Sequence, residues 1–260
     1  MFTGFDFKYP EYEVLTPQTK NTFFLRSLTV QEEERLKGSL LSASKVSEHL
    51  NRCIFDAITR KPENITDFES FLRNTTLKDR DALLYGLYDI TYEEIRNYEV
   101  TCSTCTKNYP VTIKSSSTFN INTYPGDDIL SKEIEVPLPV SKVTAVIKQP
   151  TLFDEKQVLS NLSTIYGNNL DVLTETLVIK KFIYTPESGD SVIYSDHSDI
   201  VDAYLSLPAK DKRSIFNVYR GTFGQYGIEL KMISTCIHCG NEEEIDIDLV
   251  ENFFRMVYSA

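Results

Sequence analysis

The chain has 260 residues, of which 41% are hydrophobic and 25% charged, and 27 Lys and Arg against 38 Asp and Glu give a net charge of −11. This length corresponds to one large domain or two small ones, and 15 Tyr and 15 Phe supply a core, which excludes a disordered chain. The acidity counts against a nucleic-acid-binding protein, because no net positive field attracts phosphates.

Neither a secretory leader nor a membrane span is expected. Residues 1–6 lack a basic segment followed by a continuous apolar one, and no stretch approaches the roughly 20 apolar residues that a span needs. Five cysteines are far fewer than a disulfide scaffold contains, and their odd number argues against complete internal pairing. A reducing compartment is therefore expected, where clustered cysteines usually indicate metal or redox chemistry.

The first third of the chain predicts a hairpin followed by a small helical bundle. Thr16-Pro17-Gln18-Thr19 is a turn-like segment between two β-prone ones, and Thr29 with Glu32 has the spacing of a capping box. The expected elements are a hairpin over 11–26 and helices over 29–41, 46–58, from Thr66 to 72, and 78–89.

From Asn97 the apolar period changes from the helical one to two, which predicts strands. The expected strands cover 98–101, 109–113, 134–139 and 142–147, with a polar loop over 115–132. Because proline cannot donate to a ladder, Pro137 and Pro139 place the third of these strands at a sheet edge.

The remainder predicts further helices and a second pair of strands around a cysteine motif. Helices are expected over 152–162, 170–183, 200–205 and 208–223, and strands over 192–194, 228–234 and 244–247. The aromatic tail over 249–258 is expected to close the core behind the last strand, with an exposed docking segment as the alternative.

Together these elements predict an α+β fold in which an inserted strand and helix segment separates two cysteine hairpins. The expected division is an N-terminal arm and hairpin (1–27), a helical bundle (28–95), a first CxxC hairpin with strands (96–150), a helical segment (151–225), and a second CxxC hairpin with the aromatic tail (226–260). One continuous domain is the alternative to this division.

A weak internal repeat surrounds the two cysteine pairs. Cys102 and Cys105 follow Glu99-Val100-Thr101, and Cys236 and Cys239 follow Ile233-Ser234-Thr235. Apolar residues recur six and eight positions after the second cysteine of each pair, so each copy reads strand, CxxC turn, strand. This pattern is typical of a zinc knuckle, which aims two sulfurs at one point. Gly240 suits the tight turn of the second copy.

The four cysteines Cys102, Cys105, Cys236 and Cys239 therefore predict one shared structural zinc site, closed to water because four thiolates fill a tetrahedron. Compact zinc modules separate their pairs by roughly 15–20 residues, whereas 131 positions (236 − 105) separate these pairs. The two hairpins must then meet across the fold. Ordinary thiols, one disulfide per pair and a site without metal are the alternatives.

Other chemistry has weaker support. His238 lies between two cysteines and could replace one of them as a ligand, but a turn side chain facing solvent is the favoured interpretation. A thioredoxin-like CxxC opens a helix, whereas both pairs here lie between strands. Cys53 is expected in the core, and the acidic runs 32–34 and 242–244 on solvated faces. Since no nucleotide-binding, hydrolase or zinc-protease motif occurs, a non-enzymatic protein is expected.

In order along the chain, four features resemble the T4-type bacteriophage baseplate hub protein family. They are a hairpin before Phe24-Leu25-Arg26-Ser27-Leu28-Thr29-Val30-Gln31-Glu32-Glu33, a helical stretch closing on Leu83-Leu84-Tyr85-Gly86-Leu87-Tyr88-Asp89-Ile90, the Cys102/Cys105 hairpin, and a terminal run of Cys236-Ile237-His238-Cys239-Gly240-Asn241-Glu242-Glu243-Glu244-Ile245 followed by Asn252-Phe253-Phe254. Met1 to Pro10 have no counterpart in this pattern.

The resemblance implies a non-enzymatic component of the hub of a contractile-tailed phage. It implies other baseplate and tail hub proteins as partners, no membrane, and a location in the virion tail baseplate or in the host cytoplasm during assembly; a homo-oligomer stays open. The competing hypothesis is a zinc-ribbon nucleic-acid-binding or transcription-related factor. Such ribbons carry basic knuckle faces, whereas only Lys107 and Lys114 flank the first knuckle and three glutamates follow the second.

Overall fold

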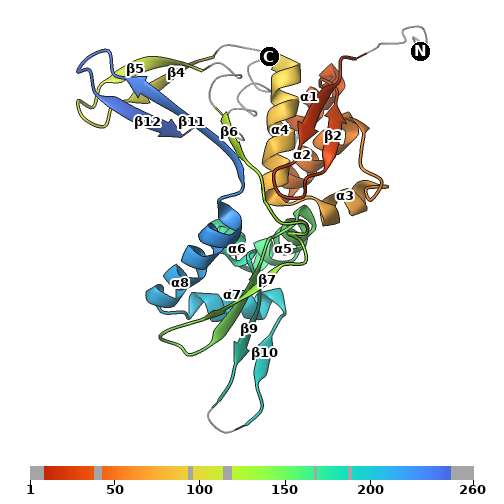
Figure 1. Cartoon of the computed structure of the whole chain (residues 1–260), viewed down its shortest axis with the longest axis vertical. Coiled ribbons are helices and arrows are strands. Elements are labelled where there is room, and N and C mark those ends of the chain that lie inside the picture. The colour runs from red at the N-terminus through yellow and green to blue at the C-terminus, as the bar shows by residue number, and fades with distance from the viewer. Residues whose placement is uncertain are drawn as a thin grey trace.

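The computed structural model describes residues 9–37, 43–92, 96–113, 119–166, 169–186 and 189–246. These residues form the expected α+β fold, with two helix-covered bodies and an arm at one side (Figure 1). The predictions for most of the N-terminal arm (1–8) and for the aromatic tail (249–258) fall outside the described residues.

The first half of the chain runs from one hairpin through four helices to a second hairpin. Its elements are β1 (Tyr12–Leu15), β2 (Thr22–Leu25), α1 (Val30–Lys37), α2 (Ala43–Ala57), β3 (Ile58–Arg60), α3 (Phe68–Asn74), α4 (Leu77–Tyr92), β4 (Arg96–Thr101) and β5 (Asn108–Ile113). The predicted hairpins and helices are confirmed. The cap of α3 is Asp67 and not Thr66, because Asp67 and Ser70 bond each other's backbone amides in a capping box.

The second half alternates strands and helices before the last hairpin. Its elements are β6 (Phe119–Asn122), β7 (Glu133–Pro137), β8 (Thr144–Lys148), α5 (Leu152–Tyr166), α6 (Leu170–Thr176), β9 (Ile179–Tyr184), β10 (Val192–Tyr194), α7 (His197–Leu205), α8 (Ala209–Tyr219), the π-helical turn η2 (Arg220–Gly224), β11 (Gly227–Thr235) and β12 (Glu242–Asp246).

Two predictions for this half are wrong. The helix expected over 170–183 ends at Thr176, and Ile179–Tyr184 forms β9 between β8 and β10. The polar loop expected over 115–132 contains β6, which pairs with the first part of β11. In both places the pairing partner is remote in sequence, so local periodicity did not reveal it.

The strands form antiparallel sheets with the orders β1-β2-β3, β10-β9-β8-β7, β12-β11-β6 and β4-β5. β7 lies at a sheet edge, as its prolines predicted. β11 joins two places in the molecule: residues 227–230 pair with β6, and residues 231–235 pair with β12. Figure 1 shows β11 running from the end of α8 into the arm.

Two hydrophobic cores organise the bodies. The first fills the space between the β1-β2-β3 sheet and helices α1 to α4, with fully buried Phe23, Ile54 and Leu83 at its centre. The second lies between the β7 to β9 sheet and helices α7 and α8, around Ile147 and Ile215. Among the helices in the described ranges, none combines the length and apolarity needed to cross a bilayer.

The two halves repeat one order of elements far beyond the cysteine motifs. Residues 12–113 (the first repeat) and 133–246 (the second repeat) each contain a hairpin, two helices, a strand that extends the hairpin sheet, two helices and a CxxC hairpin. The strand pairing with that added strand shifts its register at the corresponding place in both repeats. The shift lies between Phe24 and Leu25 in the β2–β3 pair and between Val146 and Ile147 in the β8–β9 pair. The second repeat alone adds β10 to this plan within the described residues.

Side-chain contacts repeat as well at the start of the first helix. Thr29 caps α1 with Glu32, and Thr151 caps α5 with Asp154. Each of these carboxylates also forms an ion pair with a cation six positions before it. Arg26 lies 2.7 Å from Glu32, and Lys148, its counterpart 122 positions later (148 − 26), lies 2.6 Å from Asp154. The two repeats thus begin their first helix with the same set of side-chain contacts.

The hairpin turns of the two repeats are held by matching buried carboxylates. Asp79, in the first turn of α4, accepts hydrogen bonds from the amides of Gln18 and Thr19 at 2.8 and 3.2 Å. Asp211, in the first turn of α8, accepts from the turn of the second repeat, at the amides of Val140 (2.9 Å) and Ser141 (2.8 Å). Both carboxylates are fully buried, so each turn is fixed to its own helix.

The turn of the first repeat also joins the two bodies. The side-chain amide of Gln18 donates to the carbonyls of Phe223 (3.2 Å) and Tyr226 (3.0 Å), between α8 and β11. The amide of Tyr124 donates to the Pro17 carbonyl at 2.7 Å. The predicted turn at residues 16–19 is therefore a connection between the cores as well as a chain reversal.

Glu32, expected on a solvated face, is instead buried against Arg26, and this predicts an acid-dependent stability. Burial alone raises its pKa, but hydrogen bonds from Arg26 and Thr29 outweigh it and lower the pKa from 4.5 to about 2. A carboxyl group whose pKa is lower in the folded than in the unfolded state stabilises the fold at any pH above the unfolded pKa. For Glu32 this contribution is lost as the pH falls from 4.5 towards 2. The upper limit of the contribution to the free energy of unfolding is about 3 kcal/mol.

We expect Glu32→Gln to lower the free energy of unfolding at pH 7 by about 1–3 kcal/mol, measured by urea denaturation. The difference from the wild type should shrink as the pH is lowered through this window. Glu13→Gln, at an exposed carboxylate, is the matched control and should leave stability unchanged. A difference that is constant from pH 7 to pH 3 would contradict this assignment.

Candidate metal centre

The first cysteine turn connects β4 to β5 and is built by backbone hydrogen bonds. The amide of Cys102 donates to the carbonyl of Lys107 at 3.0 Å, and the amide of Thr106 donates back to the carbonyl of Cys102 at 2.9 Å. The turn requires a left-handed residue, and Thr106 takes that conformation with φ +58°. This geometry directs the sulfurs of Cys102 and Cys105 to the same side.

The second cysteine turn, between β11 and β12, repeats these bonds position by position. The amide of Cys236 donates to the carbonyl of Asn241 at 2.8 Å, and the amide of Gly240 donates to the carbonyl of Cys236 at 2.9 Å. Gly240 is left-handed with φ +74° and takes the place of Thr106. The glycine that the sequence singled out therefore has the conformational role expected of it.

The two turns meet tip to tip. The sulfurs of Cys102 and Cys239 are 3.6 Å apart, and those of Cys105 and Cys236 are 3.7 Å apart. All four sulfurs lie within 4.8 Å of one another. The hairpins thus converge across the fold, as the shared-site hypothesis requires. All four cysteines are free thiols in this structure, with no disulfide within either pair.

This arrangement is compatible with a metal site. Four sulfurs placed about 2.3 Å from one ion at tetrahedral angles lie about 3.8 Å apart, close to the two cross-turn distances of 3.6 and 3.7 Å. The donor set consists of thiols alone, and His238 is outside it. Cys102 and Cys236 are buried, whereas Cys239 is exposed.

The backbone of the turn favours a thiolate at the centre. Hydrogen bonds from the amides of Cys105 and Thr104 lower the pKa of Cys102 to about 7, against an ordinary value of 9.0. The amide of Asn241 lowers the pKa of Cys239 too, but desolvation and the neighbouring thiols outweigh it and raise that pKa to about 12. Adjacent sulfurs resist accumulating negative charge unless a cation neutralises them.

Further contacts join the knuckle arm, by which we mean the β4–β5 and β11–β12 hairpins with their turns. Glu243 accepts hydrogen bonds from the Ser103 amide (3.1 Å) and from the buried Tyr109 hydroxyl (3.0 Å). Bonds from Ser103 and Tyr109 lower the pKa of Glu243. Nε2 of His238 donates to the Asn108 carbonyl at 3.1 Å. All three bonds connect one hairpin to the other.

These bonds were not predicted from the sequence. Glu243 was expected in a solvated acidic run, and His238 either as a ligand or as a solvent-facing turn residue. The acceptor and donor groups that they contact lie 130 or more positions away, so no local pattern indicates them. Cys53, by contrast, is buried in the first core as expected, and burial raises the pKa of its thiol to about 12.

This geometry defines a class of protein: a repeated α+β scaffold whose two halves meet at a cluster of four cysteines. The chain belongs to the T4 bacteriophage base plate protein family, whose model matches residues 9–255. The match includes both repeats and all four cysteines. It confirms the T4-type baseplate family inferred from the sequence and identifies a structural component of the phage baseplate. No curated protein and no solved structure matches the chain significantly.

The left-handed position of the second turn provides a test of the turn geometry. A Cβ added at Gly240 meets no atom within 4 Å, so the only penalty of an alanine is backbone strain at φ +74°. We expect Gly240→Ala to lower the free energy of unfolding by about 1–2 kcal/mol, measured by denaturant titration.

Gly221 is the matched control, because an added Cβ there is equally unobstructed and its φ is not left-handed. Gly221→Ala lies in the helical turn η2 and should be neutral or stabilising. Equal effects at the two glycines would show that strain at residue 240 does not govern the second turn.

Proposed function

We propose that this protein is a non-enzymatic building block of the central hub of a contractile-tail baseplate, held rigid by one structural zinc ion bound to Cys102, Cys105, Cys236 and Cys239. The convergence of four sulfurs within 4.8 Å carries the proposal. Thiolate ligands in tetrahedral geometry are the set that Zn²⁺ takes in structural sites, and four of them leave no position for a reacting water.

A bound ion would stabilise a contact that apolar packing alone supports weakly. Among those residues of the knuckle arm whose burial the structure describes, the shared core contains four buried ones. Two of them are the cysteines Cys102 and Cys236, and the others are Tyr109 and Val111. Metal binding in small zinc peptides contributes on the order of 10 kcal/mol at neutral pH. This is enough to hold two hairpins in one geometry against their conformational entropy.

The hub role rests on the sequence runs that resemble hub proteins and on the family match over residues 9–255. The protein would act by contacts with other hub proteins, in the virion tail or during assembly in the host cytoplasm. Nucleic acid is disfavoured as a partner because Glu242 and Glu244 are both exposed beside the second turn, where a ribbon that binds nucleic acid needs basic side chains.

Purified protein should contain one zinc ion per chain by elemental mass spectrometry, and a strong chelator should lower its melting temperature. Cys102→Ser and Cys236→Ser should each reduce the bound zinc well below one per chain, since each removes one of four ligands. Zinc uptake by the metal-free protein should release protons, because thiols must ionise to bind the ion.

Cys53→Ser is the control for the zinc measurement, because Cys53 lies in the first core away from the cluster. This variant should keep one zinc ion even if core packing weakens. A protein that contains no zinc and melts identically with and without chelator would refute the metal part of the proposal and leave the family membership intact.

The hub position has its own test. In phage tails assembled with an epitope-tagged copy of the chain, we expect antibody label at the centre of the baseplate, seen by electron microscopy. Phage lacking the chain should yield baseplates without a complete hub. Label confined to the baseplate periphery, or complete hubs without the chain, would contradict the hub assignment.

A further inference from the structure

The second repeat has an exposed strand that the plan shared by the two repeats does not include. In the first repeat β3 is the edge strand of the β1-β2-β3 sheet. Its counterpart β9 pairs with one strand more, β10. The first repeat builds its sheet and core without an equivalent of β10 among its described residues, so the shared fold does not require this strand.

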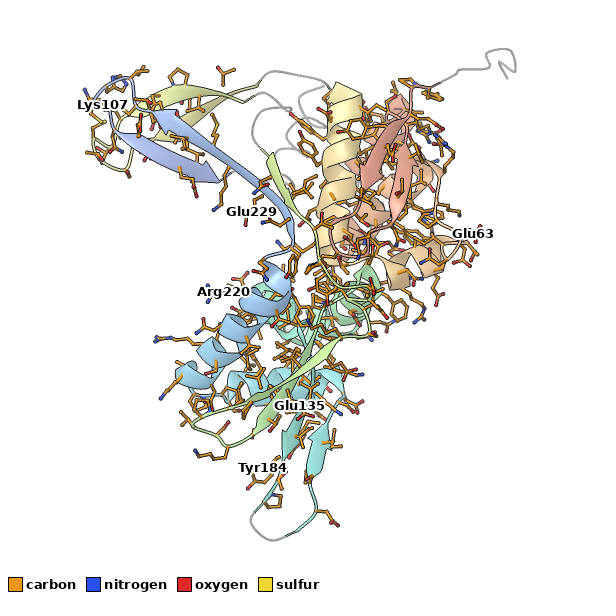
Figure 2. The ribbon with its side chains drawn as sticks, in the orientation of Figure 1. Glu63, Lys107, Glu135, Tyr184, Arg220 and Glu229 are labelled. Atoms are coloured by element: carbon orange, nitrogen blue, oxygen red, sulfur yellow. The ribbon has the colours of Figure 1, made fainter. Side chains whose placement is uncertain are left out.

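β10 is apolar and exposed over its whole length. Val192, Ile193 and Tyr194 are 44%, 55% and 38% exposed, and Tyr184, opposite Val192 on β9, is 42% exposed. The β9–β10 hairpin projects from the lower body in Figure 1, and Figure 2 shows Tyr184 on its outer part. Four large apolar side chains therefore face solvent on this hairpin. Strand β9 contributes Ile179 and Phe182 to the second core, whereas no residue of β10 is buried.

The outer edge of β10 has the backbone geometry of an open template. β10 is the last strand of its sheet, and no strand of the described chain pairs with its other side. Its register with β9 is regular over all three residues. Proteins protect such edges with lysine, proline, a bulge or a very short strand. Lysine, proline and a bulge are all missing from residues 192–194, and only the three-residue length of β10 limits its edge.

We propose that β10 accepts an extended segment of another protein, which adds a strand to the β10-β9-β8-β7 sheet. Backbone hydrogen bonds would supply affinity, and the exposed apolar side chains would select alternate residues of the incoming strand. This inference deepens the proposed role of the chain as a building block that binds other proteins, and rests on it.

The charges beside β10 define the chemistry of that segment. Asp190 and Asp196 are both exposed and enclose five uncharged residues. Antiparallel pairing of two copies centred on Ile193 places Asp190 opposite Asp196 at both ends of the ladder, and like charges opposite each other are destabilising. The partner is therefore a strand with a β-branched, apolar centre and Lys or Arg at both ends, and not a second copy.

The test uses the folded full chain and two synthetic heptapeptides with blocked ends. One has the sequence Lys-Thr-Val-Thr-Val-Thr-Lys, and the other has glutamates in place of the lysines. We expect the lysine peptide to shift the backbone amide resonances of residues 190–196 and to bind about tenfold more tightly than the glutamate peptide, since two cross-strand charge pairs reverse sign.

Two variants locate the effect. Ile193→Ser should weaken binding of the lysine peptide at least several-fold, whereas Ile233→Ser, at an even more exposed isoleucine (73%) on the central strand β11, should leave it unchanged. Replacement of both Asp190 and Asp196 by lysine should reverse the preference between the peptides. These side chains are exposed, so none of the variants should unfold the protein.

The outcomes separate this inference from the proposed function. Shifts elsewhere in the chain, equal binding of both peptides, or no binding would overturn the strand-acceptor proposal while zinc content and hub labelling stay as they were. Self-association of the wild type that Ile193→Ser abolishes would make a second copy the occupant and would also overturn it. Absent zinc or absent hub labelling would refute the proposed function without altering the peptide titration.

Discussion

The contact between two cysteine turns is the constraint on which the knuckle arm depends. Each turn is ordinary in isolation, because any β-hairpin with the right left-handed residue can form it. Their meeting places four sulfurs together, with distances of 3.6 and 3.7 Å across the junction. Because few of the arm's described side chains are both apolar and buried, this junction and the hydrogen bonds of Glu243 and His238 fix the position of one hairpin against the other.

The bodies of the molecule are held by a different principle, which the chain uses twice. In each repeat, a threonine and a carboxylate cap the start of the first helix. A buried aspartate at the start of the last helix accepts hydrogen bonds from the hairpin turn and so fixes the turn to that helix. A buried carboxylate is stable there because two backbone amides bond it. The repeats have diverged elsewhere: Gln18 in the first turn joins the bodies, and its counterpart Val140 is exposed.

This division of labour suits a structural component of a large assembly. Strand β11 leaves the second body, pairs with β6, and ends in the knuckle arm. The position of the arm is thereby coupled to the bodies through continuous hydrogen-bonded strands. Rigid modules of this kind bind partners without first losing conformational entropy, which is the advantage of preorganisation in an assembly.

Patterns among neighbouring residues were enough to predict many of the local features of this protein from its sequence. The CxxC spacing with its flanking strands, the Thr29 cap and the turn at residues 16–19 each depend on neighbours within a few positions. The family resemblance followed from such short runs. The helix expected over 170–183 shows the limit of this reasoning, because the apolar residues after Thr176 serve β9 as well as they would serve a helix.

Only the tertiary structure decided which distant segments meet. It paired β6 with β11, and it brought Cys105 within reach of Cys236 across 131 positions. It also placed the Ser103 amide where it donates a hydrogen bond to Glu243, a contact that no spacing in the sequence predicts. Hydrogen bonds and sulfur contacts between remote residues depend on where both cores place the hairpins, so their partners cannot be assigned from one stretch of chain.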